Sequence, residues 1–307
     1  MTVLSKGRAL LALAAATALL TGCATSAAQT GSPSSTKITV VAAENFWGSI
    51  ATQLGGSHAT VSSIVSNPDT DPHDYEPTPA DGRTMAGAQF AIVNGIGYDP
   101  WAPKLLAADP ASGRVVLTVG QLVGIPDNGN PHRWYSPTDV RQVIAQITKD
   151  YQRIDPADSA YFAARQQTFL TKTLARYNSL IADIKAKYAG TPIGASESIV
   201  TPLAQGLGLT MLTPETFLDA ISEGSDPTAA DKTTIDNQIR TKQIKVYVFN
   251  SQNSTPDVQA QVAEANAAGI PVTTVTETLA PANASFQDWQ VKELRGIEAA
   301  LHEATGK

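Results

Sequence analysis

The chain has 307 residues, a formal net charge of -6 and a sequence pI near 5.2. This acidic balance offers no basic surface for nucleic acid, so we expect no nucleic-acid partner. Hydrophobic residues make up 42%, as in ordinary globular chains, and the single cysteine excludes a disulfide or a multi-thiolate metal site.

The first residues predict an export signal that ends at a lipid anchor. A basic start precedes an apolar run over residues 9–20, which is too short to span a membrane comfortably. The run closes on Leu20-Thr21-Gly22-Cys23, which resembles the lipobox of bacterial lipoproteins, in which the cysteine is lipidated. We therefore expect a lipoprotein signal peptide at 1–23, a flexible tether at 24–36, and a mature protein on the extracytoplasmic face of the cell membrane, anchored through Cys23. A secretory leader that merely contains a cysteine is the alternative.

Short β-branched runs alternate with helical segments through the rest of the chain. They predict strands at 37–42, 59–65, 90–93, 115–119, 192–194, 244–249 and 271–275. The alternation is typical of mostly parallel sheets flanked by helices. About 270 residues follow the tether, which is more than one core usually holds. We therefore expect two Rossmann-like α/β lobes, at 37–156 and 190–307.

Residues 157–189 carry the longest helical pattern and are expected to link the lobes. Asp155-Pro156-Ala157-Asp158 has the cap, proline and acid of a helix start, and no glycine or proline follows before Gly190. Apolar residues in this stretch keep roughly helical spacing. One rigid helix on the order of 50 Å long predicts lobes that shift modestly rather than close through a wide hinge.

Two prolyl-histidine dipeptides stand just before strong helix starts in the first lobe. Asp71-Pro72-His73 precedes Thr78-Pro79-Ala80-Asp81, and Asn130-Pro131-His132 precedes Ser136-Pro137-Thr138-Asp139. In both starts a hydroxyl residue can cap the helix, proline suits the first turn, and the acid favours the positive helix end. Each imidazole is therefore expected in a rigid loop, which suits a metal ligand. The pair predicts a metal site.

The order and spacing of these motifs resemble a known protein family. Residues 68–79 read Pro-Asp-Thr-Asp-Pro-His-Asp-Tyr-Glu-Pro-Thr-Pro, and Val93-Asn94-Gly95, Trp101 and Asn130-Pro131-His132-Arg133-Trp134 follow. This succession is similar to the solute-binding lipoproteins of zinc and manganese ABC importers (cluster A-I type). The resemblance covers nearly the whole mature chain. It implies a carrier, not an enzyme, that captures manganese or zinc between two lobes and delivers it to an ABC permease; we expect a monomer.

The resemblance also implies the metal ligands, residue by residue. His73 and His132 match the two ligand positions of the first lobe. Counting back from Leu207-Gly208-Leu209 places Glu197 on the third position, where manganese-type members commonly have glutamate and many zinc-importer members have histidine. Glu277 falls on the fourth, where aspartate is usual. Two neutral imidazoles and two carboxylates would balance the charge of a divalent cation.

Other polar residues near these motifs have weaker assignments. Asn250 stands after a strand where relatives often carry glutamate, and we expect its amide to lie near the pocket as a hydrogen-bonding group. Asp74 and Glu76 could accept the ring N–H of the first histidine, although solvated loop acids are an equally good reading. His58 and His302 have no motif around them and are read as structural or solvent-facing.

The sequence leaves alternatives for the identity of the metal and for the class of function. A carboxylate-rich site and the absence of a histidine-rich loop at 121–130 favour manganese, whereas the Irving-Williams order favours zinc in vitro, and iron is a third candidate. A surface adhesin or structural lipoprotein with a stabilising metal is an alternative function. A metal-dependent hydrolase is another, and it would need an open coordination position beside a base. Removing the metal discriminates, because a structural site should lose its fold.

Overall fold

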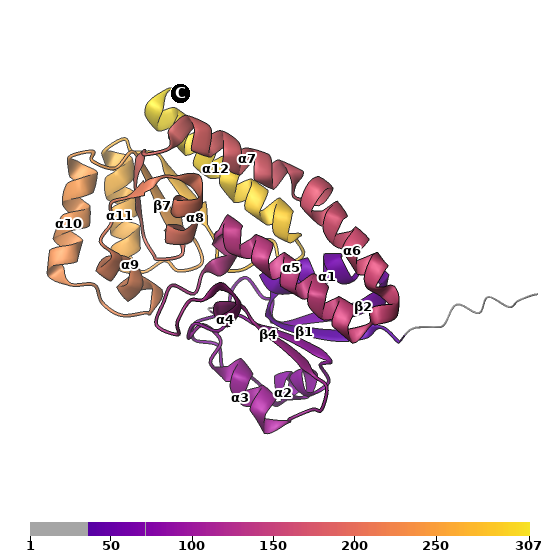
Figure 1. The fold of residues 1–307 in the computed structure, drawn as a ribbon. Coiled ribbons are helices and arrows are strands. Elements are labelled where there is room, and N and C mark those ends of the chain that lie inside the picture. The colour runs from indigo at the N-terminus through magenta and orange to yellow at the C-terminus, as the bar shows by residue number, and fades with distance from the viewer. Residues whose placement is uncertain (1–35, 71) are drawn as a thin grey trace, which may run out of the picture. The chain divides into compact units, whose positions relative to one another are not determined.

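The computed structural model describes residues 36–70 and 72–307, and this part of the chain forms two β-sheets with helices packed against them (Figure 1). The predicted signal peptide with Cys23, residues 24–35 of the tether and Asp71 lie outside the described residues. Within the described ranges, no helix has both the length and the apolar character needed to cross a membrane.

The N-terminal lobe is built on a parallel sheet with the strand order β2-β1-β3-β4. Its elements are β1 (Ile38–Glu44), α1 (Asn45–Gly55), β2 (Ala59–Val65), α2 (Pro79–Ala86), β3 (Phe90–Val93), α3 (Trp101–Ala108), β4 (Val115–Thr118), α4 (Val119–Val123) and α5 (Pro137–Ile154). Alternate residues of β1 enter different cores: Val40 packs in the larger core and Val41 in a smaller one with Trp101. Both faces of the strand are apolar because helices cover both, as parallel sheets require.

The C-terminal lobe repeats this plan, with the parallel strand order β6-β5-β7-β8. Its elements are β5 (Pro192–Ala195), α8 (Val200–Leu207), β6 (Thr210–Met211), α9 (Glu215–Ser222), α10 (Ala229–Arg240), β7 (Val246–Asn250), α11 (Pro256–Ala267), β8 (Val272–Val275) and α12 (Phe286–Thr305). The prediction of two α/β lobes with parallel sheets is confirmed, and each predicted strand is present. The short strand β6 was not predicted.

The linking segment is not the single uninterrupted helix that its sequence predicts. A 3-10 turn at Pro156–Asp158 leads into α6 (Ser159–Thr168), a π-helical turn spans Phe169–Thr173, and α7 (Ala175–Tyr188) follows. The Leu174 N–H donates to the Phe169 carbonyl at 2.9 Å, five residues back, which is the π-helical bond. This wider turn lets Phe169 and Leu174 both be buried. The helical spacing of apolar residues predicts the helical conformation of this segment but not the π-helical turn that interrupts it.

The two lobes share one hydrophobic core. Residues from both sheets, such as Ile92 and Ile193, belong to the same buried cluster. Helix α12 of the C-terminal lobe packs along α7 and also contacts α1 of the N-terminal lobe (Figure 1). A continuous core resists large rearrangement, because separating the lobes would expose apolar surface. The extent of the lobe shift stays a prediction.

A buried polar network also joins the lobes. The Tyr135 hydroxyl donates to the Thr276 carbonyl at 2.9 Å, and its oxygen also lies within hydrogen-bond distance of the Glu293 carboxyl of α12. The Thr276 N–H donates to Glu293 Oε1 at 2.9 Å, and Trp289 Nε1 donates to the Thr276 hydroxyl at 2.7 Å. Burial raises the pKa of Glu293 to about 8, although the hydrogen bonds that it accepts act in the opposite direction. At neutral pH the folded protein therefore favours a protonated Glu293.

This shift makes the stability of the metal-free protein depend on pH. A carboxyl group whose pKa is raised in the folded state adds most to the free energy of unfolding when the pH is below 4.5, the pKa taken for the unfolded state. This stabilisation falls as the pH rises to about 8. We expect Glu293→Gln, which cannot ionise, to abolish that fall of a few kcal/mol. Thermal unfolding at pH 5, 6, 7 and 8 measures it, with Glu303→Gln on the exposed side of α12 as the control. Parallel pH profiles for wild type and Glu293→Gln would contradict the assignment.

Candidate metal centre

The predicted site residues lie at the carboxyl ends of the two sheets. His73 is in the loop between β2 and α2, and His132 immediately precedes a 3-10 turn at Arg133–Tyr135. In the C-terminal lobe, Glu197 and Glu277 each stand two residues beyond the end of a strand, β5 and β8. Open α/β sheets form their binding crevices at this edge, because the strand ends leave loops free to supply side chains.

The helix starts that follow the two histidines form as predicted. Thr78 and Asp81 make a capping box at α2, with proline in the first turn. At α5 the Ser136 side chain accepts the Asp139 N–H at 3.4 Å. These caps fix where each helix begins, and therefore where the preceding loop must end. Both histidine loops are thereby anchored on their C-terminal sides.

The loop that carries His132 has a further anchor that sequence reasoning did not assign. Asn130 Oδ1 accepts the backbone N–H of His132 at 3.0 Å and lies 3.0 Å from its ring Nδ1. The Asn130 amide also donates to the Ser198 carbonyl of the other lobe at 2.6 Å. When Nδ1 is the protonated nitrogen, Nε2 is free to act as a ligand. An asparagine two residues before the histidine was the available signal, because asparagine side chains commonly bond the backbone two residues on.

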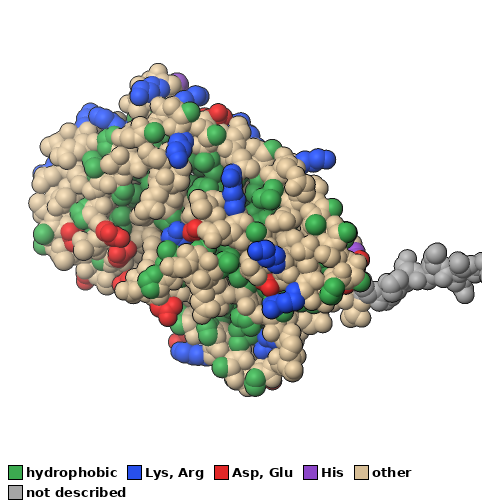
Figure 2. Space-filling view, in the orientation of Figure 1, with side chains coloured by type: hydrophobic (Ala, Val, Ile, Leu, Met, Phe, Trp, Pro, Cys, Tyr) green, Lys and Arg blue, Asp and Glu red, His purple; other side chains and the backbone are tan. Residues whose placement is uncertain are grey.

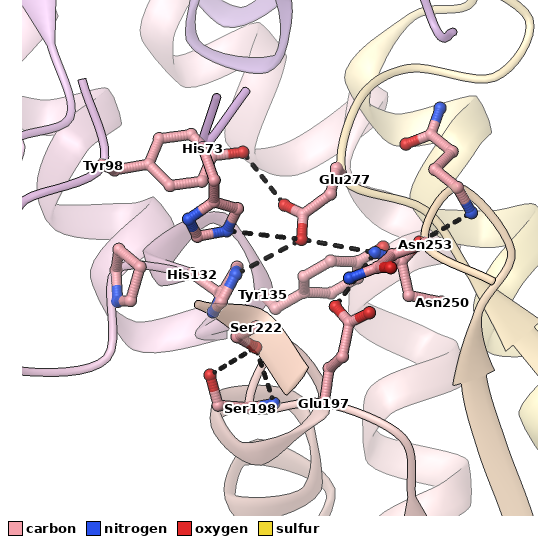
Figure 3. A network of polar contacts seen from close by, with 12 residues as sticks. His73, Tyr98, His132, Tyr135, Glu197, Ser198, Ser222, Asn250, Asn253 and Glu277 are labelled. Atoms are coloured by element: carbon pink, nitrogen blue, oxygen red, sulfur yellow. Dashed lines mark hydrogen bonds and ion pairs between the residues drawn. The ribbon is translucent and has the colours of Figure 1, made fainter. Parts of the chain in front are cut away.

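Three of the predicted ligands converge, and they come from both lobes (Figure 3). The donor atoms of His73, His132 and Glu277 all lie within 4.8 Å of one another. Glu277 Oε1 is 3.4 Å from His132 Nε2 and 3.8 Å from His73 Nε2. The His132 side chain is 0% exposed and that of His73 is 22% exposed. Solvent therefore reaches this cluster from the His73 side.

The environment of the cluster favours the protonation states that bind metal. Burial lowers the pKa of His132, although the Glu277 carboxylate acts to raise it. Burial acts to raise the pKa of Glu277, but the imidazoles of His132 and His73 outweigh burial and hold that pKa well below its ordinary value. A neutral imidazole and an ionised carboxylate are the forms that coordinate a cation.

Glu197 does not join this cluster directly. The Asn250 amide lies between the two carboxylates, and its Nδ2 donates to Glu197 Oε2 at 3.0 Å and to Glu277 Oε1 at 3.3 Å (Figure 3). Asn250 Oδ1 accepts the Gln252 N–H at 2.9 Å, which fixes the orientation of the amide. The Asn250 amide therefore links the side chain of Glu197 to the converging cluster through two successive hydrogen bonds.

Asp74 and Glu76 are not brought into the cluster. Both residues are exposed, whereas His132 and Glu277 are buried. The role of Asp74 and Glu76 as acceptors for a histidine ring stays a prediction, and their exposure gives it no support.

A buried carboxyl group orders the segment that carries Tyr98. Asp99 accepts the N–H groups of Asn94 and Gly95, each at 2.7 Å. The Asn94 side chain in turn donates to the carbonyl of Pro131, the residue before His132, at 3.0 Å. Tyr98, which was not predicted as a site residue, donates its hydroxyl to Glu277 Oε2 at 2.9 Å. One loop of the N-terminal lobe thus supports predicted ligands of both lobes.

A cavity of about 360 Å³ opens beside His73 and has an acidic lining. Its acids are Asp127, Glu215, Asp219 and Glu223. Burial, then the charges of Glu215 and Glu223, raises the pKa of Asp219. Figure 2 shows acidic side chains gathered over α9 and α10 on this face. An opening lined by one sign of charge raises the local concentration of the opposite charge, here cations.

The Tyr98 hydroxyl gives a measurable prediction. We expect Tyr98→Phe to weaken metal binding about 10-fold, because a hydrogen bond to a charged group contributes roughly 1.5–3 kcal/mol and part of it is replaced by water. Isothermal titration with zinc measures the change. Tyr151→Phe is the matched control, since this buried tyrosine of α5 donates its hydroxyl to the Ala51 carbonyl instead, at 2.9 Å. Equal affinities of the Tyr98 variant and wild type would remove Tyr98 from the site.

Comparisons with known proteins place this geometry in context. The family described as zinc-uptake complex component A, periplasmic, matches residues 40–300. The manganese-binding lipoprotein MntA of Halalkalibacterium halodurans is 26% identical over 43% of this chain and 44% of that protein. The iron-binding protein YfeA of Yersinia pestis is 29% identical over 48% of this chain and 50% of that protein. The chain thus spans about half the length of these relatives.

Solved structures show the same fold. The Mn-bound periplasmic metal binding protein of Candidatus Liberibacter asiaticus superposes with a TM-score of 0.73 at 21% identity. The match covers 86% of this chain and 100% of that one. At this identity, the likeness establishes the two-lobed architecture alone.

Proposed function

Because the chain belongs to the family of periplasmic zinc-uptake complex component A, we propose that it captures a divalent transition metal ion, manganese or zinc, for import. One observation carries the proposal: His73 and His132 of one lobe converge with Glu277 of the other in a largely buried cluster. The proposal rests on the position of this cluster between the lobes, where a small lobe movement changes the distances among its donors.

We propose His73, His132, Glu277 and Glu197 as the ligands. In this arrangement the metal ion would bind Glu277 and the two imidazoles, which now contact one another directly. Glu197 would complete the set when the Asn250 amide that now joins it to Glu277 gives way. The two carboxylates would neutralise the cation, which lowers the cost of burying it.

The polar contacts around the site suggest how capture and release would be coupled to the lobes. Asn130 of the N-terminal lobe donates to Ser198, next to Glu197, and Tyr98 of the same lobe donates to Glu277. A lobe movement that breaks these bonds would also separate the ligands. We expect the shared hydrophobic core to keep such a movement small.

Delivery to a membrane permease, with an ATPase beneath it, is part of the same proposal. We propose that lipidation of Cys23 holds the carrier on the extracytoplasmic face, and that the tether at 24–36 lets it reach the permease. The name of MntA as a lipoprotein supports this reading. The carrier is proposed to act as a monomer and without catalysis.

Metal identity is the open part of the proposal. The relatives named above are called manganese-binding and iron-binding, and the family is described by zinc. Two carboxylates suit manganese, but zinc should bind the same donors more tightly in vitro. Affinity alone therefore does not identify the cargo.

Elemental analysis of the protein purified from its native host tests the proposal. We expect about one equivalent of manganese or zinc per chain, and competition of the two ions on the stripped protein then measures selectivity. The stripped protein should stay folded and rebind metal reversibly. Unfolding on metal removal would contradict a carrier and favour a structural metal, as in an adhesin.

A further inference from the structure

A second group of potential metal ligands lies at the opposite edge of the N-terminal sheet. The donor atoms of His58, Asp155 and Asp158 all lie within 4.8 Å of one another. His58 immediately precedes β2, whereas the His73 loop follows that strand. Seven residues of strand at about 3.3 Å each separate the two places by roughly 20 Å. The group is therefore not an extension of the central cluster.

The fold holds these three side chains in place. The His58 ring packs on the Tyr161 ring at a centroid distance of 4.1 Å, and the Tyr161 hydroxyl accepts the N–H of the preceding Ser57 at 3.0 Å. Asp155 caps the end of α5 and Asp158 closes the 3-10 turn that begins at a proline. Ligands that are held before the ion arrives lose little entropy on binding. Figure 2 shows histidine and acidic atoms meeting at the surface over the β2 and α6 end of this lobe.

The contact between His58 and Asp158 has an unusual geometry. His58 Nδ1 lies 2.7 Å from Asp158 Oδ2, yet within the described part of the chain this buried nitrogen has no hydrogen-bond partner. The carboxylate oxygen therefore lies off the direction in which the ring nitrogen points. Two donors that coordinate one zinc ion at 2.0–2.1 Å stand about 3.4 Å apart and face the ion, not each other. At 2.7 Å, the two atoms would separate by about 0.7 Å to take up that arrangement.

We propose that His58, Asp155 and Asp158 form a second binding site for a divalent cation, with zinc as the best-fitting ion. One imidazole and two carboxylates supply an NO₂ donor set, and water completes the coordination because all three residues are partly exposed. The two negative charges match the cation. The partial exposure of these three residues makes this site weaker than the largely buried central one.

The site would tie two distant parts of the chain together. His58 lies in the turn between α1 and β2, and the two aspartates lie where the linking segment leaves α5. Cation binding would stabilise this junction and not the cleft between the lobes. This function goes beyond metal import and does not depend on it. It also revises the reading of His58 as an ordinary structural or solvent-facing histidine.

Titration of the stripped full chain with zinc, followed by calorimetry, tests the proposal. We expect wild type to bind one equivalent of zinc tightly and a second equivalent more weakly. His58→Ala and Asp158→Asn should each lose only the weakly bound equivalent. The second variant keeps the size of its side chain, so that loss of binding cannot be ascribed to misfolding. His302→Ala, which removes an exposed histidine of α12, is the matched control and should keep both equivalents.

Three outcomes decide between the possibilities. A single equivalent in wild type would mean that His58 and Asp158 form an ion pair only, and would overturn the proposal. A weaker equivalent that persists in both variants would overturn it as well. Loss of the weakly bound zinc in the double variant His73→Ala/His132→Ala would assign that zinc to the central cluster. Its retention in the double variant would support the second site, even if the central cluster proved not to bind metal.

Discussion

His132→Ala is expected to abolish tight metal binding and to leave a folded protein. The His132 ring is 0% exposed, and its Nε2 is 3.4 Å from Glu277 Oε1. Alanine removes the imidazole from a buried position, where a water molecule is a poor replacement for it as a ligand. Loss of a residue that merely orients a ligand typically costs 10–100-fold in metal affinity, so loss of the ligand itself should cost at least about 100-fold. Equilibrium dialysis of the stripped protein against zinc and manganese measures the loss.

His302→Ala is the matched control, because His302 is an exposed histidine on α12. Its affinity should equal that of wild type. Circular dichroism checks that the His132 variant keeps its helices. An affinity for zinc within a few-fold of wild type in His132→Ala would remove this residue from the site, whatever the behaviour of the other ligands.

Glu277→Gln is expected to have an effect of similar size for a different reason. Glutamine nearly keeps the shape of glutamate but removes the negative charge that faces both imidazoles. A buried dication with one carboxylate fewer keeps a net charge, which is costly to hold away from water. We expect metal to raise the melting temperature of wild type and to leave that of Glu277→Gln almost unchanged, because stabilisation follows the ratio of metal concentration to Kd.

Glu264→Gln on α11 is the control for this experiment, since it removes a half-buried carboxylate of the same lobe outside the converging group. Its metal-dependent shift should match that of wild type. A full shift in Glu277→Gln would show that the charge of Glu277 is not needed. The assignment of the C-terminal ligand would then pass to Glu197.

Local signals accounted for much of what the sequence predicted. Strands such as β2 and β3 were bounded correctly because β-branched runs end at turn residues. The caps at Thr78 and Ser136 were predicted because each uses residues only three positions apart. The two prolyl-histidine loops predicted a metal site from the residues alone, whereas Glu277 was assigned to that site through family resemblance, since it is far from both histidines along the chain.

Features that depend on packing were missed. The π-helical turn at Phe169–Thr173 arises because Phe169 and Leu174 must both face the core, a requirement that helical periodicity alone does not express. Asn250 was expected near the pocket as a hydrogen-bonding group, but its position between two carboxylates depends on the register of β5, β7 and β8. Tyr98 bonds Glu277 across the lobes, and no local pattern marks that contact. Such features require the tertiary structure.

Anomalous diffraction from crystals grown with manganese, and separately with zinc, tests the central claim most directly. We expect in both cases a strong anomalous peak within coordination distance of His73 Nε2, His132 Nε2 and a Glu277 oxygen, with Glu197 turned toward it. A fully occupied peak elsewhere, with no density among these side chains, would contradict capture of the ion between the lobes.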